Sequence, residues 1–480
     1  MKRYYIFLLI SFMIVLYLFS FCGKRDKIVV TIGKKNNITI QDLRSYYKQK
    51  FNKDMDRVSY SELKSGLDQL IEDEIKIKAA YDMGLDKDSS LVEKIKEFRE
   101  NAMLQKLHEL EITDQIINEL LIRDFYNKSS RVIEYQDLII QGNNAQKPEE
   151  IQEKKKKAEM ILQELTSDRS FEKVGDKYSS DPYVHIEEKK ITYSRINDSF
   201  QNSIYSLKKG EVSDVIKKSK DFHIVKIKNI LHKDTEPYEK KREEIQKKLF
   251  YQLRPQIQYK SQQYLNDLVE KANIIWNDEN LDRLYSFLNN IKPENQVIGT
   301  VNDSLKNMPE DIKQSELFTS NDKSYTVQYV INKLSEYRPY TRFSVSEKKL
   351  IKNRILLFHK NDLIKEKAYS LNLDTHPEVK EKVQDFKRRL LIRELHKTGI
   401  FNTEDPTESE IYNYFSQHED DKYSNFKDRN FDQIKHRIKR DLQMKRTDDI
   451  KNNWISEKKK EYNVKIFENV LKEIADEKNE

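Results

Sequence analysis

The chain has 480 residues, which is enough for two to four domains and too many for one compact core. Charged residues make up 35% of it and hydrophobic residues 37%, with only nine Gly and nine Pro, so the composition favours long solvated helices and excludes glycine-rich β-sandwiches. The net charge of +7 is small and spread along the chain, so we expect no binding to nucleic acid. A single cysteine and nine scattered histidines indicate neither a disulfide framework nor a metal site, and no cofactor motif is present.

The N-terminus is typical of an export signal. Two basic residues precede an uncharged, mostly apolar run from Tyr4 to Phe21, as in the n- and h-regions of a secretory signal. Cys22 follows at once, which resembles a bacterial lipoprotein signal, although Phe21 replaces the usual small residue. We predict that residues 1–22 are this signal and that Cys22 is lipidated. The alternative is an uncleaved anchor, because about eighteen apolar residues can just span a bilayer. Both place the remaining chain outside the cytoplasm, facing the periplasm on a membrane.

An internal repeat organises the rest of the chain. Residues 79–108 align on residues 367–396 at one constant offset, without gaps. A short strand pair near Val29–Gln41 precedes the first copy, and long Lys-rich helical stretches follow both copies. We therefore expect two helical frames in tandem, in each of which the C-terminal helix packs on its own N-terminal segment. The first copy also contains an insert, residues 131–233.

The insert carries recognisable motifs. A strand candidate at Val132–Ile140 is followed by a helix over 148–165, and then by the strings SFEKV, YSSDP, LKKGEVSDVI and FHIVKI. This order resembles the parvulin-type (PpiC) peptidyl-prolyl isomerase domain, and the helical segments around it resemble the frame of the SurA, PrsA and PpiD envelope chaperones. The resemblance implies a sheet formed by Val132–Ile140, a strand near Ile191–Tyr193 and the strand that contains His223.

The resemblance also implies site residues. Phe200 matches the aromatic residue of the proline cup and Ile196 its aliphatic partner, and we group Phe222 with them as substrate-binding. His223 matches the second histidine of the family, and Asp181 matches the acidic or cysteine position that faces it. These side chains would favour the twisted amide over the planar one, with no nucleophile or metal.

Two departures from the family pattern affect this site. Asp137 stands where the family has a histidine in its first strand, and we count Asp137 with His223 and Asp181 as the candidate catalytic residues. The usual Gly-Gly-Asp-Leu-Gly turn is replaced by Ile186–Ile191, which places Lys190 near the apolar lining. Because a lysine disfavours an apolar cup, we expect weak isomerase activity or none.

The predicted fold is mainly α with an inserted α+β parvulin domain and two SurA-like chaperone frames in tandem. The predicted parts are the signal at 1–22, a first frame at 28–129 and 236–282, the parvulin-like domain at 131–233, and a second frame at 297–471 that lacks the insert. Linkers are expected near Ser129–Arg131, Lys233–Pro237 and Asn277–Pro293.

Three functions remain open. The first is a membrane-anchored extracytoplasmic holdase or foldase for unfolded envelope or outer-membrane polypeptides, with a degenerate parvulin domain. The second is an active peptidyl-prolyl cis–trans isomerase that acts on proline-containing polypeptides. The third is a non-catalytic scaffold lipoprotein with one folded partner.

Overall fold

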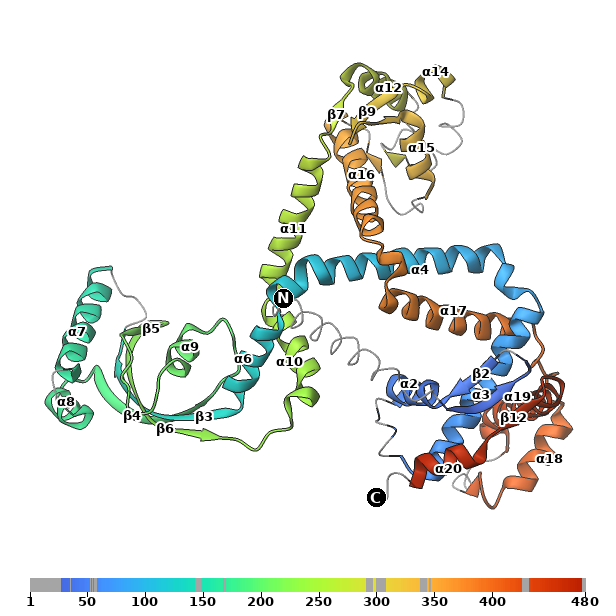
Figure 1. Cartoon of the computed structure of the whole chain (residues 1–480), viewed down its shortest axis with the longest axis horizontal. Coiled ribbons are helices and arrows are strands. Elements are labelled where there is room, and N and C mark those ends of the chain that lie inside the picture. Colours follow the sequence, from blue (N-terminus) through green and yellow to red (C-terminus); the bar gives the residue numbers. More distant parts are fainter. Residues whose placement is uncertain are drawn as a thin grey trace, which may run out of the picture. The chain divides into compact units, whose positions relative to one another are not determined.

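The structure is a computed structural model of the whole chain. It describes residues 27–476 apart from 35, 52, 54, 56–57, 143–147, 167–169, 291–296, 299–307, 337–342, 345–346 and 425–430, so the predicted signal and Cys22 lie outside the described residues. The chain is mainly helical and carries one small α+β region, as predicted (Figure 1). It divides into two compact units, Met1–Glu100 with Pro377–Glu480 and Asn101–His376.

The first unit combines segments from both ends of the chain. α3 begins at a capping box between Ser59 and Glu62, and the apolar stripe predicted on this helix is buried in the core, from Leu63 to Ile75. The elements of this unit are β1 (Ile28–Ile32), β2 (Asn36–Thr39), α2 (Ile40–Phe51), α3 (Tyr60–Asp82), η2 (Leu85–Lys87), the first part of α4 (Ser89–His108), α17 (Pro377–Lys397), α18 (Glu408–His418), α19 (Phe431–Glu461), β12 (Val464–Ile466) and α20 (Glu468–Asp476).

The second unit contains the parvulin-like region and a small lobe that follows it. The connecting helical elements are η3 (Glu109–Thr113), α5 (Asp114–Ile116), α6 (Glu119–Ser129), α10 (Tyr238–Gln252) and α11 (Arg254–Lys271). The elements of the lobe are β7 (Ile275–Trp276), α12 (Asp278–Asn290), β8 (Val297–Ile298), α14 (Glu310–Lys313), β9 (Glu316–Ser320), β10 (Lys323–Thr326), α15 (Val327–Glu336), β11 (Phe343–Ser344), α16 (Lys348–Ser370) and η4 (Leu373–Thr375).

The predicted repeat is visible in the secondary structure. The offset that relates the aligned segments also relates the start of β1 to the start of β9, and the start of α3 to the start of α16. The equivalent residues Phe98 and Phe386 stack on each other, with their ring centroids 4.0 Å apart. A contact between equivalent residues is the contact that a local two-fold relation between two copies produces.

The lobe of the second unit has an equivalent lobe in the first unit, formed by β1, β2, α3, β12 and α20. Both lobes are built from both copies of the repeat. β1 pairs with β2 and also with β12, which comes from the end of the second copy. In the other lobe, β9 pairs with β10 and with β7, which comes from the end of the first copy. The prediction that the C-terminal helix of each copy packs on its own N-terminal segment holds for α10 on α6 and α19 on α18, but it is wrong for the segments that follow these helices, because the copies exchange β7 and β12.

One predicted linker is also a structured element. Most of Asn277–Pro293 forms α12, whose leucines 281, 284 and 288 are buried against β9 and α16. Their spacing is that of one helix face, and this face completes the core of the lobe. The other two linkers agree with the structure, since α6 ends at Ser129, β6 ends at His232 and α10 begins at Tyr238.

The parvulin-like region is a four-stranded antiparallel sheet in the order β4-β3-β6-β5, with helices on both faces. β3 pairs with both β4 and β6 along almost its whole length, so β3 and β6 are central. The elements are β3 (Arg131–Ile140), α7 (Pro148–Thr166), α8 (Phe171–Tyr178), β4 (Val184–Thr192), α9 (Ser199–Tyr205), β5 (Ile216–Lys218) and β6 (Asp221–His232). No helix within the described ranges holds an apolar stretch long enough to cross a bilayer.

Candidate functional site

The two faces of the parvulin-like sheet carry different side chains. Successive residues of a strand point to opposite faces, so β3 and β6 each contribute one set to each side. On one face, Leu138, Ile140 and Ile224 pack with α7 and α8 in a purely apolar cluster. On the other face, Tyr135 and Val225 pack with α9. The candidate polar residues lie on this second face.

Asp137 and His223 form a buried pair on the α9 face. Asp137 lies opposite Val225 and His223 lies opposite Ile139, so the two are diagonal neighbours on adjacent strands. Nδ1 of His223 lies 2.9 Å from Oδ1 and 3.1 Å from Oδ2 of Asp137. A carboxylate only accepts hydrogen bonds, so the Nδ1–H of His223 is the donor. The aspartate is 1% exposed and the histidine 6%.

Lys189 adds a third charge to this pair. The Lys189 ammonium lies 3.2 Å from Oδ2 of Asp137 and 2.5 Å from Oε2 of Glu187 on the same strand, β4. Burial opposes the charged form, but the hydrogen bonds to Glu187 and Asp137 raise the pKa of Lys189 above its usual value. The bond to Lys189 likewise lowers the pKa of Glu187. The α9 face therefore holds a charged network where the family resemblance implied two histidines and an apolar cup.

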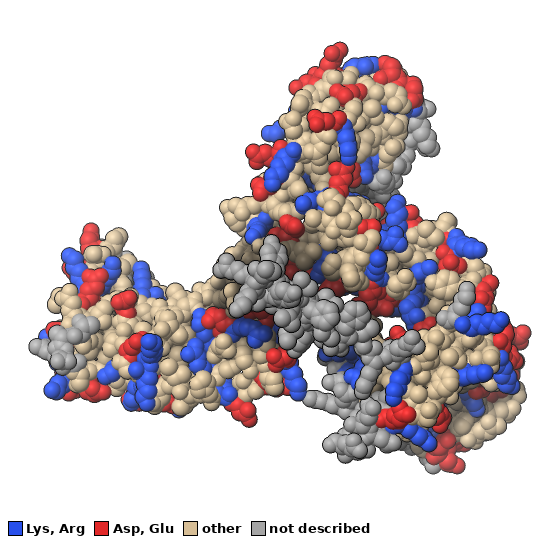
Figure 2. Space-filling model, in the orientation of Figure 1, with Lys and Arg blue, Asp and Glu red and all other residues tan. Residues whose placement is uncertain are grey.

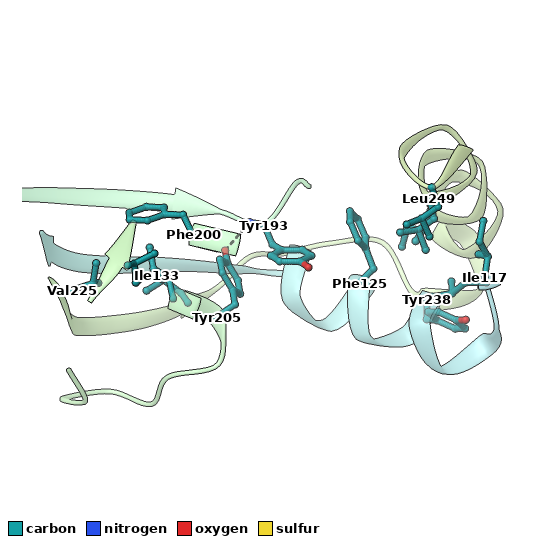
Figure 3. Packing of buried hydrophobic residues seen from close by; sticks show 14 of the residues in the cluster. Ile117, Phe125, Ile133, Tyr193, Phe200, Tyr205, Val225, Tyr238 and Leu249 are labelled. Carbon is teal, nitrogen blue, oxygen red and sulfur yellow. Dashed lines mark hydrogen bonds between the residues drawn. The ribbon is translucent and has the colours of Figure 1, made fainter. Parts of the chain in front are cut away.

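Phe200 lies beside this network. Its ring is 5.0 Å from the His223 ring, edge to face, and only 2% of Phe200 is exposed. The ammonium of Lys218, on β5, lies 4.1 Å from the centre of the Phe200 ring. Figure 3 shows Phe200 and Tyr205 of α9 near Ile133 and Val225 of the sheet. The ring predicted to receive a proline is thus packed beneath a lysine.

The loop that carries Ile196 is fastened to a helix outside the sheet. Ile196 is half-buried against the same cluster as Phe200. The side chain of Gln252, the last residue of α10, accepts a hydrogen bond from the Ile196 N–H at 2.8 Å and donates one to the Ser194 carbonyl at 2.8 Å. The Phe125 and Tyr193 rings, 5.3 Å apart, extend the same core between α6 and the end of β4 (Figure 3). The candidate cup is therefore continuous with the surrounding helices.

Two predicted site residues do not join His223 on the α9 face. Asp181 precedes β4, where its carboxylate is bound by Lys157 of α7 and by the Tyr183 N–H. The hydrogen bond from Lys157 lowers the pKa of Asp181. The residue that faces His223 is Asp137, so the expectation that Asp181 faces it is wrong. Phe222 points to the α7–α8 face, because it is the immediate neighbour of His223 in β6, and so it cannot share a cup with Phe200.

Sequence reasoning chose the wrong lysine. Lys190, predicted near the lining, is exposed and pairs with Glu134 at 2.7 Å. Lys189 reaches Asp137 instead, because the segment Ile186–Ile191 continues as a regular strand and neighbouring residues alternate between faces. Lys218 and Gln252 were missed entirely, since neither belongs to a motif. A strand alternation drawn through this segment could have identified Lys189.

The arrangement limits what this site can do chemically. Prolyl isomerisation needs an apolar surface for the ring and polar groups that favour the twisted amide. The His223 Nδ1–H is committed to Asp137, which also binds the charged Lys189, and the charged Lys218 borders the Phe200 ring. Stripping water from such charges when an apolar ring enters is costly. Within the described residues there is no cluster of side chains that could hold a metal ion.

Comparisons with known proteins agree with the resemblance. Residues 138–229 match the family model described as Rotamase, PPIC-type PPIASE domain. The foldase protein PrsA 4 of Bacillus cereus is 25% identical over 275 residues, which cover 55% of this chain and 90% of that protein. The chaperone SurA of Methylobacillus flagellatus is 28% identical over 143 residues, which cover 28% of this chain and 32% of that protein.

Solved structures of similar proteins cover comparable parts of the chain. A SurA-like chaperone chain of Campylobacter jejuni covers 50% of this chain and 97% of its own, with 17% identity and a TM-score of 0.20. The peptidyl-prolyl isomerase PrsA of Bacillus cereus covers 56% of this chain and 100% of its own, with 18% identity and a TM-score of 0.24. The chain thus carries a PpiC-type parvulin domain and is similar to the PrsA foldases and SurA chaperones.

Proposed function

We propose that this protein is an extracytoplasmic, membrane-anchored holdase for unfolded envelope or outer-membrane polypeptides, and that its parvulin domain has weak isomerase activity or none. The similarity to PrsA and SurA supports the chaperone class. The predicted signal with Cys22 supports the anchor and the compartment. The roles given to Asp137, Asp181, His223, Phe200, Ile196 and Phe222 in the family pattern remain proposals, and those of Asp181 and Phe222 are structural in this account.

One observation carries the proposal of a weak or inactive isomerase. Phe200 is 2% exposed and has the Lys218 ammonium 4.1 Å from its ring centre. A proline that replaced this lysine would end a cation–π contact of about 0.5–2 kcal/mol and would meet a charged group at the rim of its cup. The ring would also gain little new apolar area, since Phe200 already packs against Tyr135 and His223.

The helices next to the parvulin domain offer apolar side chains to solvent. Tyr251 is 75% exposed and Tyr259 is 67% exposed, and Phe250 beside them is 39% exposed. They lie at the end of α10 and on α11, close in sequence to Gln252, which holds the Ile196 loop. Exposed aromatic side chains of this kind bind extended apolar segments of unfolded chains. We assign client binding to this part of the second unit.

The test is suppression of aggregation. The soluble chain from Lys24 onward is added to a chemically unfolded outer-membrane protein at increasing ratios, and light scattering is followed after dilution. The wild type should suppress scattering at near-stoichiometric ratios, and the double variant Tyr251→Ser/Tyr259→Ser should need several-fold more protein. The matched control is Tyr412→Ser in the first unit, where Tyr412 is 56% exposed on α18. No suppression by the wild type would reject the holdase, and equal loss in the control would reject the assigned surface.

A second candidate function is catalysis of prolyl isomerisation. The observation that favours it is the placement of His223 against Phe200 on one face of the sheet, as the family resemblance implies. A scaffold role is the third candidate. A scaffold would hold one folded partner and leave the aggregation of several unrelated unfolded proteins unchanged, so the scattering assay with three different clients separates it from a holdase.

A further inference from the structure

The lobe of the second unit contains a histidine in its core. His359, on α16 (Figure 1), is 1% exposed, and Ser320 of β9 is equally buried beside it. The Nε2 atom of His359 lies 2.7 Å from Oγ of Ser320. Three aromatic rings surround the imidazole, with centroid distances of 5.0 Å to Phe318, 4.7 Å to Tyr325 and 6.3 Å to Tyr329. An ionisable side chain thus lies inside an aromatic cage.

The hydrogen bonds around Ser320 determine the protonation state of this imidazole. The Ser320 hydroxyl donates its one hydrogen to the Ala272 carbonyl at 3.3 Å, so its oxygen accepts from the Nε2–H of His359. Nδ1 then carries the lone pair, and it has no hydrogen-bond partner among the described residues. The Ala272 carbonyl also accepts the Asn321 N–H at 2.7 Å. His359 in its neutral form therefore supports the contact between the end of α11 and the β9–β10 turn.

The acidic groups that face the imidazole already have partners. Asp362, one turn further along α16, accepts hydrogen bonds from Lys333 at 2.8 Å and from the Tyr329 hydroxyl at 2.7 Å, both on α15. Glu366, the next acidic residue on this face, pairs with Lys323 of β10 at 3.4 Å. Either carboxylate could bind a charged imidazole only by giving up a partner.

A proton on Nδ1 would place a charge in the cage without a hydrogen-bond acceptor, which is costly. Burial lowers the pKa of His359, and the nearby Lys333 ammonium acts in the same direction. Asp362 and Glu366 raise this pKa, but by less than burial lowers it. Tyr325 of β10 stays neutral, since burial raises the pKa of its phenol. When the lobe opens, the imidazole reaches water and its pKa returns to about 6.5.

We propose that His359 makes this lobe pH-sensitive, so that the closed lobe is stable near neutral pH and is opened progressively in mild acid. The stabilising contribution of the neutral imidazole is fully present above its unfolded pKa of about 6.5, and it is lost as the pH falls below that value toward the folded pKa. The elements that separate are those that His359 holds together, namely α16, the β9–β10 hairpin and the end of α11. Opening exposes Phe318 and the buried leucines 281, 284 and 288, so the chain gains apolar surface in mild acid.

Hydrogen exchange tests this proposal in the chain from Lys24 onward. Exchange of β9, β10 and α16 is followed by mass spectrometry at about pH 7.5 and about pH 5.5, and each rate is divided by the intrinsic rate at that pH to give an opening constant. In the wild type this constant should rise by up to about tenfold, the ratio of charged to neutral imidazole one pH unit below the unfolded pKa. His359→Gln keeps a donor for Ser320 but does not titrate, so its constant should change by less than about twofold.

The matched control is His108→Gln in the same unit. His108 is a half-buried histidine whose pKa is also lowered by burial. Both of its ring nitrogens have partners, since Nε2 lies 3.0 Å from Oγ of Ser261 and Nδ1 lies 3.3 Å from Oγ1 of Thr113. Because His108 lies outside the lobe, His108→Gln should leave the rise in the opening constant of the lobe unchanged.

Two results would overturn the proposal. Equal opening constants at the two pH values in the wild type would show that the lobe does not respond to acid, whatever the variants do. An equal rise in the wild type and in His359→Gln would show that the proton is bound elsewhere. If circular dichroism near neutral pH shows that His359→Gln is unfolded, His359→Met takes its place, because methionine fills the cage with an apolar side chain that does not titrate.

Discussion

The two faces of the parvulin-like sheet differ in the chemistry of the side chains that they bury. The face toward α7 and α8 is apolar, with Leu138, Ile140 and Ile224 all within 1% exposure. On the face toward α9, His223 lies next to Phe200, and Asp137 binds both His223 and the Lys189 ammonium. Both faces are covered by helices, and the buried Asp137–His223 pair lies on the α9 face. On the face drawn in Figure 2, basic and acidic residues are interspersed over the surface.

The two faces thus distinguish the side chains that stabilise the domain from side chains that serve another purpose. Apolar burial at about 25 cal/mol per Å² stabilises a domain without demanding particular partners. A buried charge pair is at best a weak contribution to stability, because desolvation offsets the attraction. Such a pair is therefore expected where selection has acted on something other than stability. In this chain the network lies where the family resemblance places catalysis, and Lys218 borders the Phe200 ring beside it.

The largest expected effect follows from breaking the network at its centre. Asp137→Asn keeps the size of the side chain but leaves Lys189 without its buried partner and removes the charged acceptor of the His223 Nδ1–H. We expect a loss of about 3 kcal/mol in the free energy of unfolding, measured by urea denaturation. A loss below about 0.5 kcal/mol would mean that the charges of this face are solvated in the folded protein.

Removing the network as a whole should cost much less. In Asp137→Leu/His223→Leu the hydrogen-bonded pair is replaced by apolar side chains of similar size, and Lys189 retains Glu187. We expect this double variant to be at least about 1 kcal/mol more stable than Asp137→Asn, since it leaves no buried His223 imidazole without its carboxylate acceptor. Thermal and urea unfolding are measured for Asp137→Leu, for His223→Leu and for the double variant, which completes a double-mutant cycle. Strict additivity of the single effects would contradict the coupling of the two residues.

A conservative change on the apolar face should have a smaller effect. Ile224 is fully buried and packs with α7 and α8. Ile224→Val removes one methylene and should cost about 0.5–1.5 kcal/mol of unfolding free energy with no change in the urea m-value. A cost as large as that of Asp137→Asn would remove the distinction between the two faces.

The smallest effect is expected at the Asp181–Lys157 pair. The hydrogen bond from Lys157 lowers the pKa of Asp181 in the folded state, so its stabilising contribution is present above the unfolded pKa and is lost as the pH falls through the folded value. The window therefore lies below about pH 4. Asp181→Asn should lower stability by about 0.5–1 kcal/mol at pH 7 and by progressively less as the pH falls and the folded-state carboxylate becomes protonated. A difference that stays unchanged as the pH falls would argue against the ion pair.

Much of the fold could be predicted from local patterns, whereas the exchange could not. The repeat, the β3 strand and the limits of the insert follow from periodicity and motif order, which are local properties. The segments β7–α12 and β12–α20 each pair with the other copy in equivalent registers, and nothing in the local pattern of either segment specifies which copy it joins. Only the tertiary structure shows this.

The site was predictable to within one residue along a strand. His223, Phe200 and Asp137 were identified from motif positions, and the structure brings all three together. Lys190 was chosen in place of Lys189 because the segment was compared with a turn, and a shift of one residue in a strand reverses the face. Lys218 and Gln252 act through tertiary contacts from other elements, which no spacing in the sequence indicates.

The central claim is that the charged α9 face does not support catalysis, and cis-to-trans isomerisation of short proline peptides tests it most directly. Rates are measured with the chain from Lys24, with His223→Ala, and with His185→Ala as the matched control, since His185 is a half-exposed histidine on β4. Our account predicts the uncatalysed rate in all three cases, and a measurable acceleration only when Lys218→Ala uncovers the Phe200 ring. Acceleration by the wild type that disappears in His223→Ala and persists in His185→Ala would contradict it and make the protein an active prolyl isomerase.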